Sequence, residues 1–191
     1  MLDIKSIIQS SIDVKYELIN SSIHEIKKAS EMLLSAAKLN KKIIWCGNGG
    51  SAADSQHMAA ELMGGLRDHN RPPIYSIALT TDTSFITAWA NDTSFDTIFS
   101  RQIEAIGNPG DVLVAISTSG NSKNVINAIK IAKDKKLNIV ILTGKSGGKM
   151  KLLGDVSIFI PSDDTQRIQE GHLLVEHILC EYVEEGFLSN L

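Results

Sequence analysis

The chain lacks the features that mark secreted, disulfide-rich and nucleic-acid-binding proteins. It contains two cysteines, Cys46 and Cys180, far apart and in apolar surroundings, which excludes a disulfide framework and a CxxC zinc or redox motif. We expect both thiols to be reduced and buried. The formal net charge is −3 and no run of Lys or Arg is long enough to follow a phosphate backbone, so we expect no nucleic-acid ligand.

Long hydrophobic runs are also missing. The longest apolar stretches, such as 112–116 and 139–142, are far too short to cross a bilayer and suit buried strands. Residues 1–11 include Asp3 and Lys5 and show neither a signal-peptide core nor a small-residue cleavage site. We therefore expect a soluble cytoplasmic protein that does not bind membranes.

The sequence that is present predicts one α/β domain. Its 191 residues, 43% of them hydrophobic, are enough for one substantial core, and no repeat or linker divides them. Apolar residues three and four apart within residues 1–40 predict two amphipathic helices. Beyond them, β-rich runs alternate with helical patterns, and the predicted strands are 43–46, 74–78, 111–117, 138–143 and 156–160. This order predicts a three-layer αβα sandwich with a five-stranded parallel sheet covered on both faces.

Three of the predicted strands are followed by loops rich in Gly, Ser, Thr or Asn. These loops are 47–51, 117–122 and 144–148. In open α/β sheets, ligands bind beyond the carboxyl ends of the strands. We therefore expect the three loops to lie around one site.

The loop 117–122, Ser-Thr-Ser-Gly-Asn-Ser, leads into a predicted helix and is called the serine loop below. The free N–H groups and the dipole of a helix N-terminus favour an anion, and the loop's hydroxyls can donate to phosphate oxygens. The loop contains no Lys and does not match GxxxxGK[ST], which favours a monophosphate over a nucleoside triphosphate. The same residues also fit a capped helix with ordinary turn residues.

The loop 47–51, Gly-Asn-Gly-Gly-Ser, repeats this arrangement after the first strand and is called the glycine loop below. Its glycines allow a ligand to approach the backbone, and Ser51 with Asp54 predicts a capping box on the next helix. The loop lacks the GxGxxG order of a dinucleotide site. A strained turn without a ligand fits the same residues.

Two helical segments have the spacing of metal ligands. His57 and Glu61 lie four residues apart on one face of the helix after the glycine loop. The last predicted helix contains a second group, Gln169, His172, Glu176 and His177. Such His, Glu and Gln side chains suit zinc or a similar divalent ion, although each His also fits a surface or core position. Because Gln169 and His177 are about 12 Å apart along a helix axis, one ion would reach both only through extended side chains or at a subunit interface.

Taken together, these segments resemble the phosphoheptose isomerases of the sugar isomerase (SIS) family over nearly the whole chain. The segments that carry the resemblance are 46–54, 56–57, 60–62, 90–92, 116–122, 142–144, 147–150 and 167–170. The serine loop alone would indicate only a phosphosugar-binding SIS domain. The pair His57 and Glu61, together with Gln169 and His177, indicates the isomerase branch.

The resemblance implies a flavodoxin-like SIS domain over residues 1–191, in which residues 1–40 serve oligomerisation. It implies an isomerase that converts sedoheptulose 7-phosphate into D-glycero-D-manno-heptose 7-phosphate, the first step of nucleotide-activated heptose biosynthesis for lipopolysaccharide core, capsule or another glycan. It further implies a homotetramer with active sites between subunits and one zinc ion per subunit. The implied zinc ligands are His57, Glu61, Gln169 and His177. The implied substrate contacts are Asn48, Gly49, Gly50, Ser51, Glu61, Asn91, Asp92, Ser117, Thr118, Ser119, Ser122 and Gln169.

Interconversion of a ketose and an aldose through an enediol requires a base and an acid beside two adjacent carbons. We assign Glu61 as the base and His177 as the acid. A carboxylate that binds a cation tightly is a poorer base, so Glu61 has to coordinate loosely or exchange roles. One departure from the family concerns substrate binding, because many relatives have an Arg where this chain has Gly65. A phosphate contact from that Arg would be absent here or pass to Arg67 or Arg71.

A second hypothesis belongs to another class, a non-catalytic SIS-domain protein that associates with the bacterial replication initiator. Proteins of that kind look similar along most of the chain but replace the residues matching Glu61 and His177. Because this chain keeps both, the enzyme is the favoured hypothesis. A sugar-phosphate-sensing regulator is a third hypothesis, but no DNA-binding segment accompanies the domain.

Overall fold

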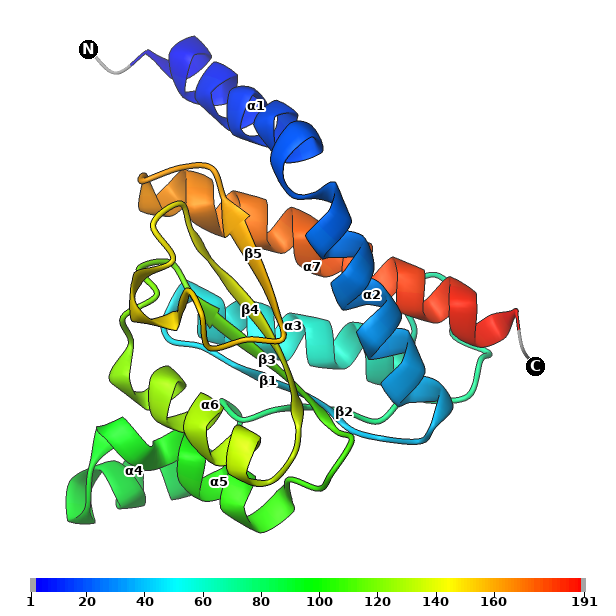
Figure 1. Ribbon diagram of the computed structural model, residues 1–191, viewed down its shortest axis with the longest axis vertical. Coiled ribbons are helices and arrows are strands. Elements are labelled where there is room, and N and C mark those ends of the chain that lie inside the picture. Colours follow the sequence, from blue (N-terminus) through cyan, green and yellow to red (C-terminus); the bar gives the residue numbers. More distant parts are fainter. Residues whose placement is uncertain (1–2, 190–191) are drawn as a thin grey trace.

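A parallel sheet forms the centre of the computed structural model, which describes residues 3–189 (Figure 1). Its strands are β1 (Ile43–Cys46), β2 (Ser76–Ala78), β3 (Val112–Ser117), β4 (Asn138–Gly144) and β5 (Val156–Ile160). Their order is β2-β1-β3-β4-β5, and every neighbouring pair is parallel. The predicted five-stranded parallel sheet is therefore confirmed. β2 begins later than predicted because the N–H of Ile74 donates to the carbonyl of Leu62 on a helix instead of to a strand.

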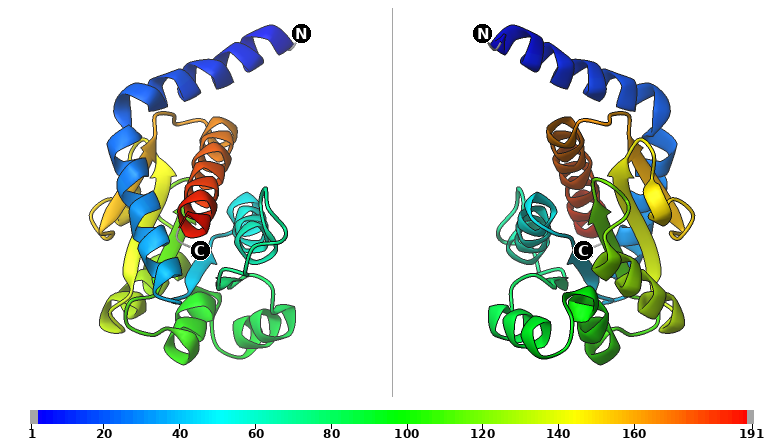
Figure 2. Two further views of the ribbon diagram at one scale, coloured as in Figure 1. Left: turned by 90° about the vertical axis from the view of Figure 1, so that its right-hand side faces the viewer. Right: turned by 90° about the vertical axis from the view of Figure 1, so that its left-hand side faces the viewer.

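Helices cover both faces of the sheet (Figure 2). They are α1 (Ile4–Ser21), α2 (Ile23–Lys38), α3 (Gly50–Gly64), α4 (Thr83–Asp92), α5 (Ile98–Ile106), α6 (Lys123–Asp134) and α7 (Thr165–Leu188), with short 3-10 turns η1 (Phe95–Thr97) and η2 (Gly148–Met150). Successive strand side chains point to opposite faces, so Ile43 and Trp45 pack with α2, α3 and α7, whereas Ile44 and Cys46 pack with α5 and α6. The result is the predicted αβα sandwich, with one apolar core on each face of the sheet.

The two predicted amino-terminal helices are confirmed, but they are placed differently. α2 packs against α7 and β5, whereas α1 projects away from the sheet (Figures 1 and 2). A stripe along α1 remains 52–70% exposed. The residues of this α1 stripe are Ile4, Ile8, Ile12, Tyr16 and Ile19. Within one chain, α1 thus buries little of its apolar face.

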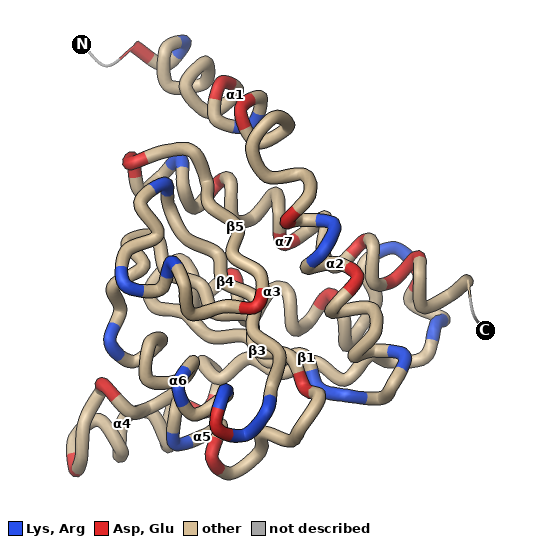
Figure 3. The backbone as a smooth tube through the Cα atoms, viewed as in Figure 1, with Lys and Arg blue, Asp and Glu red and all other residues tan. Residues whose placement is uncertain are grey.

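The surface and the thiols agree with the composition. Lys and Arg are interspersed with Asp and Glu along the backbone (Figure 3). Cys46 and Cys180 are free and buried, as predicted. No helix within residues 3–189 is both long enough and apolar enough to span a membrane.

The predicted capping box of Ser51 and Asp54 is wrong. α3 begins at Gly50, its N-cap is Gly49, and no side chain accepts a hydrogen bond at this cap. Gly49 adopts a φ of 59°, a conformation that favours glycine, and this turns the chain into the helix earlier than predicted. Ser51 therefore lies inside the first turn, where it is 3% exposed.

A buried ion pair ties the C-terminal end of α3 to α7. The Nε of Arg71 donates to Glu184 over 2.6 Å, and the two side chains are 1% and 4% exposed. The Arg71 guanidinium also donates to the carbonyls of Glu61 and Leu62 in the last turn of α3. Burial alone would raise the pKa of Glu184, but hydrogen bonds from Arg71 and from three backbone N–H groups lower it to about 2. Those three groups belong to Leu66, Arg67 and Asp68.

Glu184→Gln tests the contribution of this ion pair to stability. The pKa of Glu184 is about 2 in the folded state against an ordinary value of 4.5, so its stabilisation is present above pH 4.5 and is lost as the pH falls toward 2. The shift corresponds to about 3 kcal/mol. We expect Glu184→Gln to lower the free energy of unfolding at neutral pH by about that amount and to flatten its decrease in acid, as measured by urea denaturation.

The matched control is Glu181→Gln on the same helix. Glu181 pairs with Arg67, but both side chains are well exposed, so this change should cost less than about 1 kcal/mol. Equal stability of Glu184→Gln and the wild type at neutral pH would contradict the assignment.

Candidate active site

The predicted metal ligands of α3 meet α7 where these two helices pack side by side (Figures 1 and 2). His57 Nε2 lies 3.0 Å from Glu61 Oε1, one turn further along α3. The ring of His177 on α7 stands edge-on to the ring of His57, with 5.0 Å between their centroids. His57, Glu61 and His177 each offer a ligand atom, and these atoms lie within 4.8 Å of one another. The structure thus brings together residues far apart in sequence.

The chemistry of these groups fits a divalent cation. His177 Nδ1 lies 3.0 Å from the carbonyl oxygen of Leu173, which can accept a hydrogen bond only from a protonated nitrogen. This contact leaves His177 Nε2 as the nitrogen free to bind a metal or a proton. His57 Nε2 and the Glu61 carboxylate complete a nitrogen and oxygen donor set of the kind that zinc accepts.

Asp54 lies close enough to His57 and His177 to interact electrostatically with both, and no sequence pattern indicated this. Burial raises the pKa of Asp54, whereas interaction with His57 and His177 lowers it. Asp54 lies one helical turn before His57, so helical spacing alone allows the interaction between these two residues. Its interaction with His177 arises only because α3 packs against α7.

Gln169 approaches the glycine loop. A Cβ atom at Gly50 would collide with the Gln169 side chain, so the glycine permits the close contact between the start of α3 and α7. Gly50 precedes His57 by about two turns of helix, and Gln169 precedes His177 by a similar distance. In one chain Gln169 is therefore placed to contact the glycine loop, and its role as a metal ligand remains a prediction.

The serine loop lies between β3 and α6. Ser122 is the N-cap residue of α6, but its hydroxyl lies 3.0 Å from that of Ser117 and caps no backbone group. The next loop holds the serine loop through two backbone hydrogen bonds, from Gly144 N to Thr118 O and from Met150 N to Gly120 O, and a third bond runs from Lys149 N to Asn121 Oδ1. A pocket of about 260 Å³ opens beside it. Its lining is Thr118, Ser119, Asn121, Gly144, Lys145, Ser146, Ser162, Asp163, Thr165 and Ile168.

Asn91 and Asp92 do not belong to the group formed by α3 and α7. They are exposed at the C-terminal end of α4, where the Asn91 amide donates to the Asp92 carboxylate. α4 packs against η1 and α5, and Figure 2 shows it well away from α7. The turn η1 that follows α4 lies beside the start of α6, where Asp96 contacts Lys123 and Asn127. The substrate contact of Asn91 and Asp92 stays a prediction.

The structure accounts for Gly65 and limits the replacements for the missing Arg. Gly65 has a φ of 110°, and a Cβ atom there would lie 2.6 Å from the Asp68 carbonyl oxygen, so this backbone has no room for an Arg. Arg71 is fully engaged by Glu184 and the end of α3, which removes it as a phosphate ligand. Arg67 is exposed and pairs with Glu181.

His172 and Glu176, the other members of the predicted group on α7, do not join the cluster of ligand atoms. Both are fully buried, and the two carboxyl oxygens of Glu176 have no hydrogen-bond partner within residues 3–189. A backbone hydrogen bond with Thr143 acts on His172, but its effect on the pKa is smaller than that of burial. Burial lowers the pKa of His172 to about 4. Burial and the neighbouring Asp54 raise the pKa of Glu176 well above its ordinary value. The imidazole of His172 is therefore neutral near pH 7, and the charged form of the Glu176 carboxyl is disfavoured.

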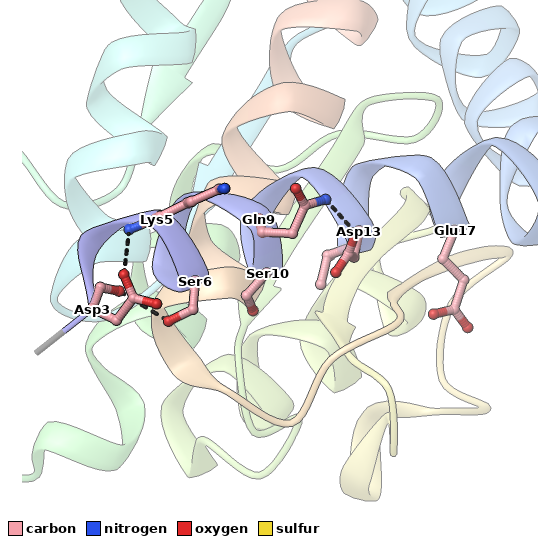
Figure 4. A pocket seen from close by; sticks show the side chains of 8 residues that line it. Asp3, Lys5, Ser6, Gln9, Ser10, Asp13 and Glu17 are labelled. Carbon is pink, nitrogen blue, oxygen red and sulfur yellow. Dashed lines mark hydrogen bonds between the residues drawn. The ribbon is translucent and has the colours of Figure 1, made fainter.

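A groove of about 560 Å³ along α1 is a different kind of feature (Figure 4). Its lining consists of Asp3, Lys5, Ser6, Gln9, Ser10, Asp13, Val14 and Glu17. All of these residues belong to α1 or its N-cap, so one helix forms the groove without a second wall. The groove contains none of the predicted site residues.

Known proteins match the chain over most of its length. A family model described as SIS domain matches residues 8–144. The phosphoheptose isomerase of Sulfurimonas denitrificans is 47% identical over 189 residues, which cover 98% of this chain and 96% of that protein. That of Shewanella denitrificans is 52% identical over 184 residues, with coverage of 95% and 93%.

Solved structures give the same picture. A phosphoheptose isomerase from Neisseria gonorrhoeae has a TM-score of 0.89 at 43% identity, covering 95% of this chain and 97% of that chain. One from Francisella tularensis has a TM-score of 0.92 at 37% identity, covering 95% and 96%. At 20% identity and a TM-score of 0.69, the Vibrio vulnificus NanR protein shares the fold alone.

Glu176→Met tests the cost of the buried carboxyl group. Because both carboxyl oxygens lie buried without a partner in the described chain, the change should raise the free energy of unfolding by about 1–3 kcal/mol. Urea denaturation at neutral pH measures the change. Glu181→Met, at an exposed position of α7, should have a much smaller effect. A destabilised Glu176→Met protein would mean that another molecule or subunit satisfies the carboxyl group.

Proposed function

The chain belongs to the phosphoheptose isomerases of the SIS domain family, and we propose that Glu61 and His177 carry out its reaction where α3 meets α7. It is an aldose–ketose isomerase that converts sedoheptulose 7-phosphate into D-glycero-D-manno-heptose 7-phosphate. The observation that carries the residue assignment is the group of His57, Glu61 and His177, whose ligand atoms lie within 4.8 Å of one another.

The reaction moves protons between two neighbouring carbons and between their oxygens. In our proposal the Glu61 carboxylate removes a proton from C1 of the ketose and returns it to C2. His177 transfers a proton from the oxygen on C1 to the oxygen on C2 through Nε2, because Nδ1 is engaged by the Leu173 carbonyl. Together the two residues complete the isomerisation without net gain or loss of protons.

We propose one zinc ion per subunit, held by His57, Glu61 and His177 with Gln169 as the fourth ligand. When bound, the ion supplies a Lewis acid that polarises the substrate carbonyl. Since only Nε2 of His177 is free, this nitrogen cannot bind metal and carry a proton at the same moment. His177 therefore has to change partners during turnover. The Glu61 carboxylate has two oxygens, but tight binding to a cation would make it a poorer base, so Glu61 has to coordinate loosely or exchange roles.

The substrate lies, in this proposal, between the glycine loop and the serine loop. The serine loop and the N-terminus of α6 take the phosphate, because they combine hydroxyl groups with free backbone N–H groups. Asn48, Gly49, Gly50, Ser51, Glu61 and Gln169 line the opposite side. The remaining serine-loop contacts are Ser117, Thr118, Ser119 and Ser122.

We further propose a homotetramer whose subunits share active sites, with residues 1–40 of the single domain forming part of the contact. The exposed α1 stripe needs an apolar surface to pack against. The His57 side chain is 43% exposed, so a neighbouring subunit could also reach it. Asn91 and Asp92 would then reach the site of a neighbouring subunit. The free, buried thiols fit the reducing cytoplasm, where we place the enzyme. An association with the replication initiator is not favoured, since Glu61 and His177 are both retained.

The first test concerns proton transfer. Glu61→Gln and His177→Asn retain approximate size and hydrogen bonding, so each should keep the fold while turnover of sedoheptulose 7-phosphate falls by a factor on the order of 10² to 10⁴. Exchange of the substrate's C1 proton with deuterated solvent, followed by NMR, reports the enediol step directly. Exchange at the wild-type rate in both variants would remove the assignment.

Two controls accompany this test. His69→Asn and Glu104→Gln, at exposed positions outside residues 1–40, should leave turnover unchanged. Bound zinc has to be measured in each variant by mass spectrometry, because loss of the metal would lower turnover for another reason. A variant that keeps its metal and loses exchange supports proton transfer by that residue.

A second test concerns the α1 stripe. Ile8→Glu with Ile12→Glu places charges on the exposed apolar face, so we expect a folded protein that no longer forms tetramers in analytical ultracentrifugation and has reduced turnover. Ser10→Glu, on the opposite face of α1, is the matched control and should remain tetrameric. A fully active wild-type monomer would contradict the shared site.

A further inference from the structure

A reciprocal pair of amides joins the glycine loop to the start of α6. Asn48 Nδ2 donates to Asn124 Oδ1 and Asn124 Nδ2 donates to Asn48 Oδ1, each over 2.9 Å. Asn124 lies in the first turn of α6 and is 3% exposed. Neither the sequence pattern nor the resemblance singled it out, because it follows the serine loop without any distinguishing spacing.

The pair connects the segments that follow two neighbouring strands, β1 and β3, and these segments lead to helices on opposite faces of the sheet. β1 and β3 are neighbours in the sheet, with Cys46 opposite Ala115. The chain leaves β1 for α3 on one face and leaves β3 for α6 on the other face. In open sheets, such a switch point is where ligands bind. The two asparagines therefore connect the two loops that border the proposed substrate site.

The orientation of the Asn124 amide is fixed by a further contact. Its Oδ1 also accepts a hydrogen bond from the backbone N–H of Val125, over 2.9 Å. Rotating the amide by half a turn would place its NH₂ group against two donors, so the observed orientation is strongly favoured. The reciprocal pair then imposes a single orientation on the Asn48 amide as well.

This arrangement leaves Asn48 with one N–H and one oxygen lone pair for a ligand. An amide has two N–H groups and two oxygen lone pairs, and the pair uses one of each on Asn48. A hydroxyl group both donates and accepts, so it matches the remaining sites of Asn48. The hydroxyl-bearing chain of a sugar phosphate offers such groups.

We propose that Asn124 is a positioning residue, which orients the Asn48 amide toward a substrate hydroxyl and holds the glycine loop beside the serine loop. The inference rests on the proposed position of the substrate between these loops. Asn124 itself does not need to touch the substrate. Its effect should therefore appear in substrate binding and should depend on Asn48.

The experiment is a double-mutant cycle of Asn48→Ala and Asn124→Ala, with KM and kcat for sedoheptulose 7-phosphate measured for each tetrameric protein. Each single change should raise KM about two- to tenfold, with a smaller change in kcat, as for loss of a substrate hydrogen bond. The double variant should be no worse than the weaker-binding single variant, because both changes remove the same oriented contact.

Two further variants separate positioning from folding. Asn124→Ser keeps a hydroxyl near the Val125 N–H but is too short to reach Asn48, so it should raise KM with little loss of thermal stability. If Asn124→Ala fails to fold, Asn124→Ser takes its place in the double-mutant cycle. Asn127→Ala removes an amide on the same helix that donates to the Asp96 carbonyl, and it should leave KM unchanged.

The outcomes distinguish a failure of this inference from a failure of the proposed substrate position. If Asn48→Ala raises KM but the Asn124 variants do not, or if the two effects multiply, Asn124 is not a positioning residue. If Asn48→Ala itself leaves KM unchanged, the proposed position of the substrate is wrong, and the inference is overturned with it. Similar increases in KM for Asn48→Ala and Asn124→Ala, with no further increase in the double variant, support the inference.

Discussion

The register between α3 and α7 is the constraint on which the site depends. At one end, Gly50 lets Gln169 approach the backbone of α3, because any Cβ there would collide with the glutamine. At the other end, the buried pair of Arg71 and Glu184 ties the last turn of α3 to α7. Between these contacts, the His57 and His177 rings meet edge-on. Because the helices are fixed at both ends, a small shift of either would separate the groups that are proposed to share a metal and a proton.

The sheet order explains why two loops and two helices meet at one place. β1 and β3 lie side by side, yet the chain after them turns to opposite faces, so the glycine and serine loops border the switch point. Helix N-termini supply donors on both sides, and hydrogen bonds from the loop after β4 hold the serine loop in place. Binding groups thus lie on rigid supports, while His57, Glu61 and His177 occupy a helix–helix surface nearby.

A single chain leaves several of these groups exposed. The α1 stripe is exposed, His57 faces outward, and Asn91 with Asp92 lies away from α7. The proposed tetramer would cover the α1 stripe and place a second subunit beside His57. His172 and Glu176 are fully buried on the same helix as His177. Burial and the neighbouring Asp54 raise the pKa of Glu176, which disfavours a second negative charge beside Asp54.

Local patterns were sufficient for the strands, for the two amino-terminal helices and for the pairing of His57 with Glu61, because alternation, helical spacing and glycine loops act over a few residues. The residues predicted through the resemblance included His177, whose contact with His57 crosses from one helix to another. Local sequence was misleading at Ser51, where the conformation of Gly49 started α3 earlier. Asp54, Asn124 and the burial of Arg71 emerged only from the tertiary structure. Each depends on a partner distant in sequence, His177, Asn48 and Glu184 respectively, and packing of the sheet and helices alone decides which distant side chains meet.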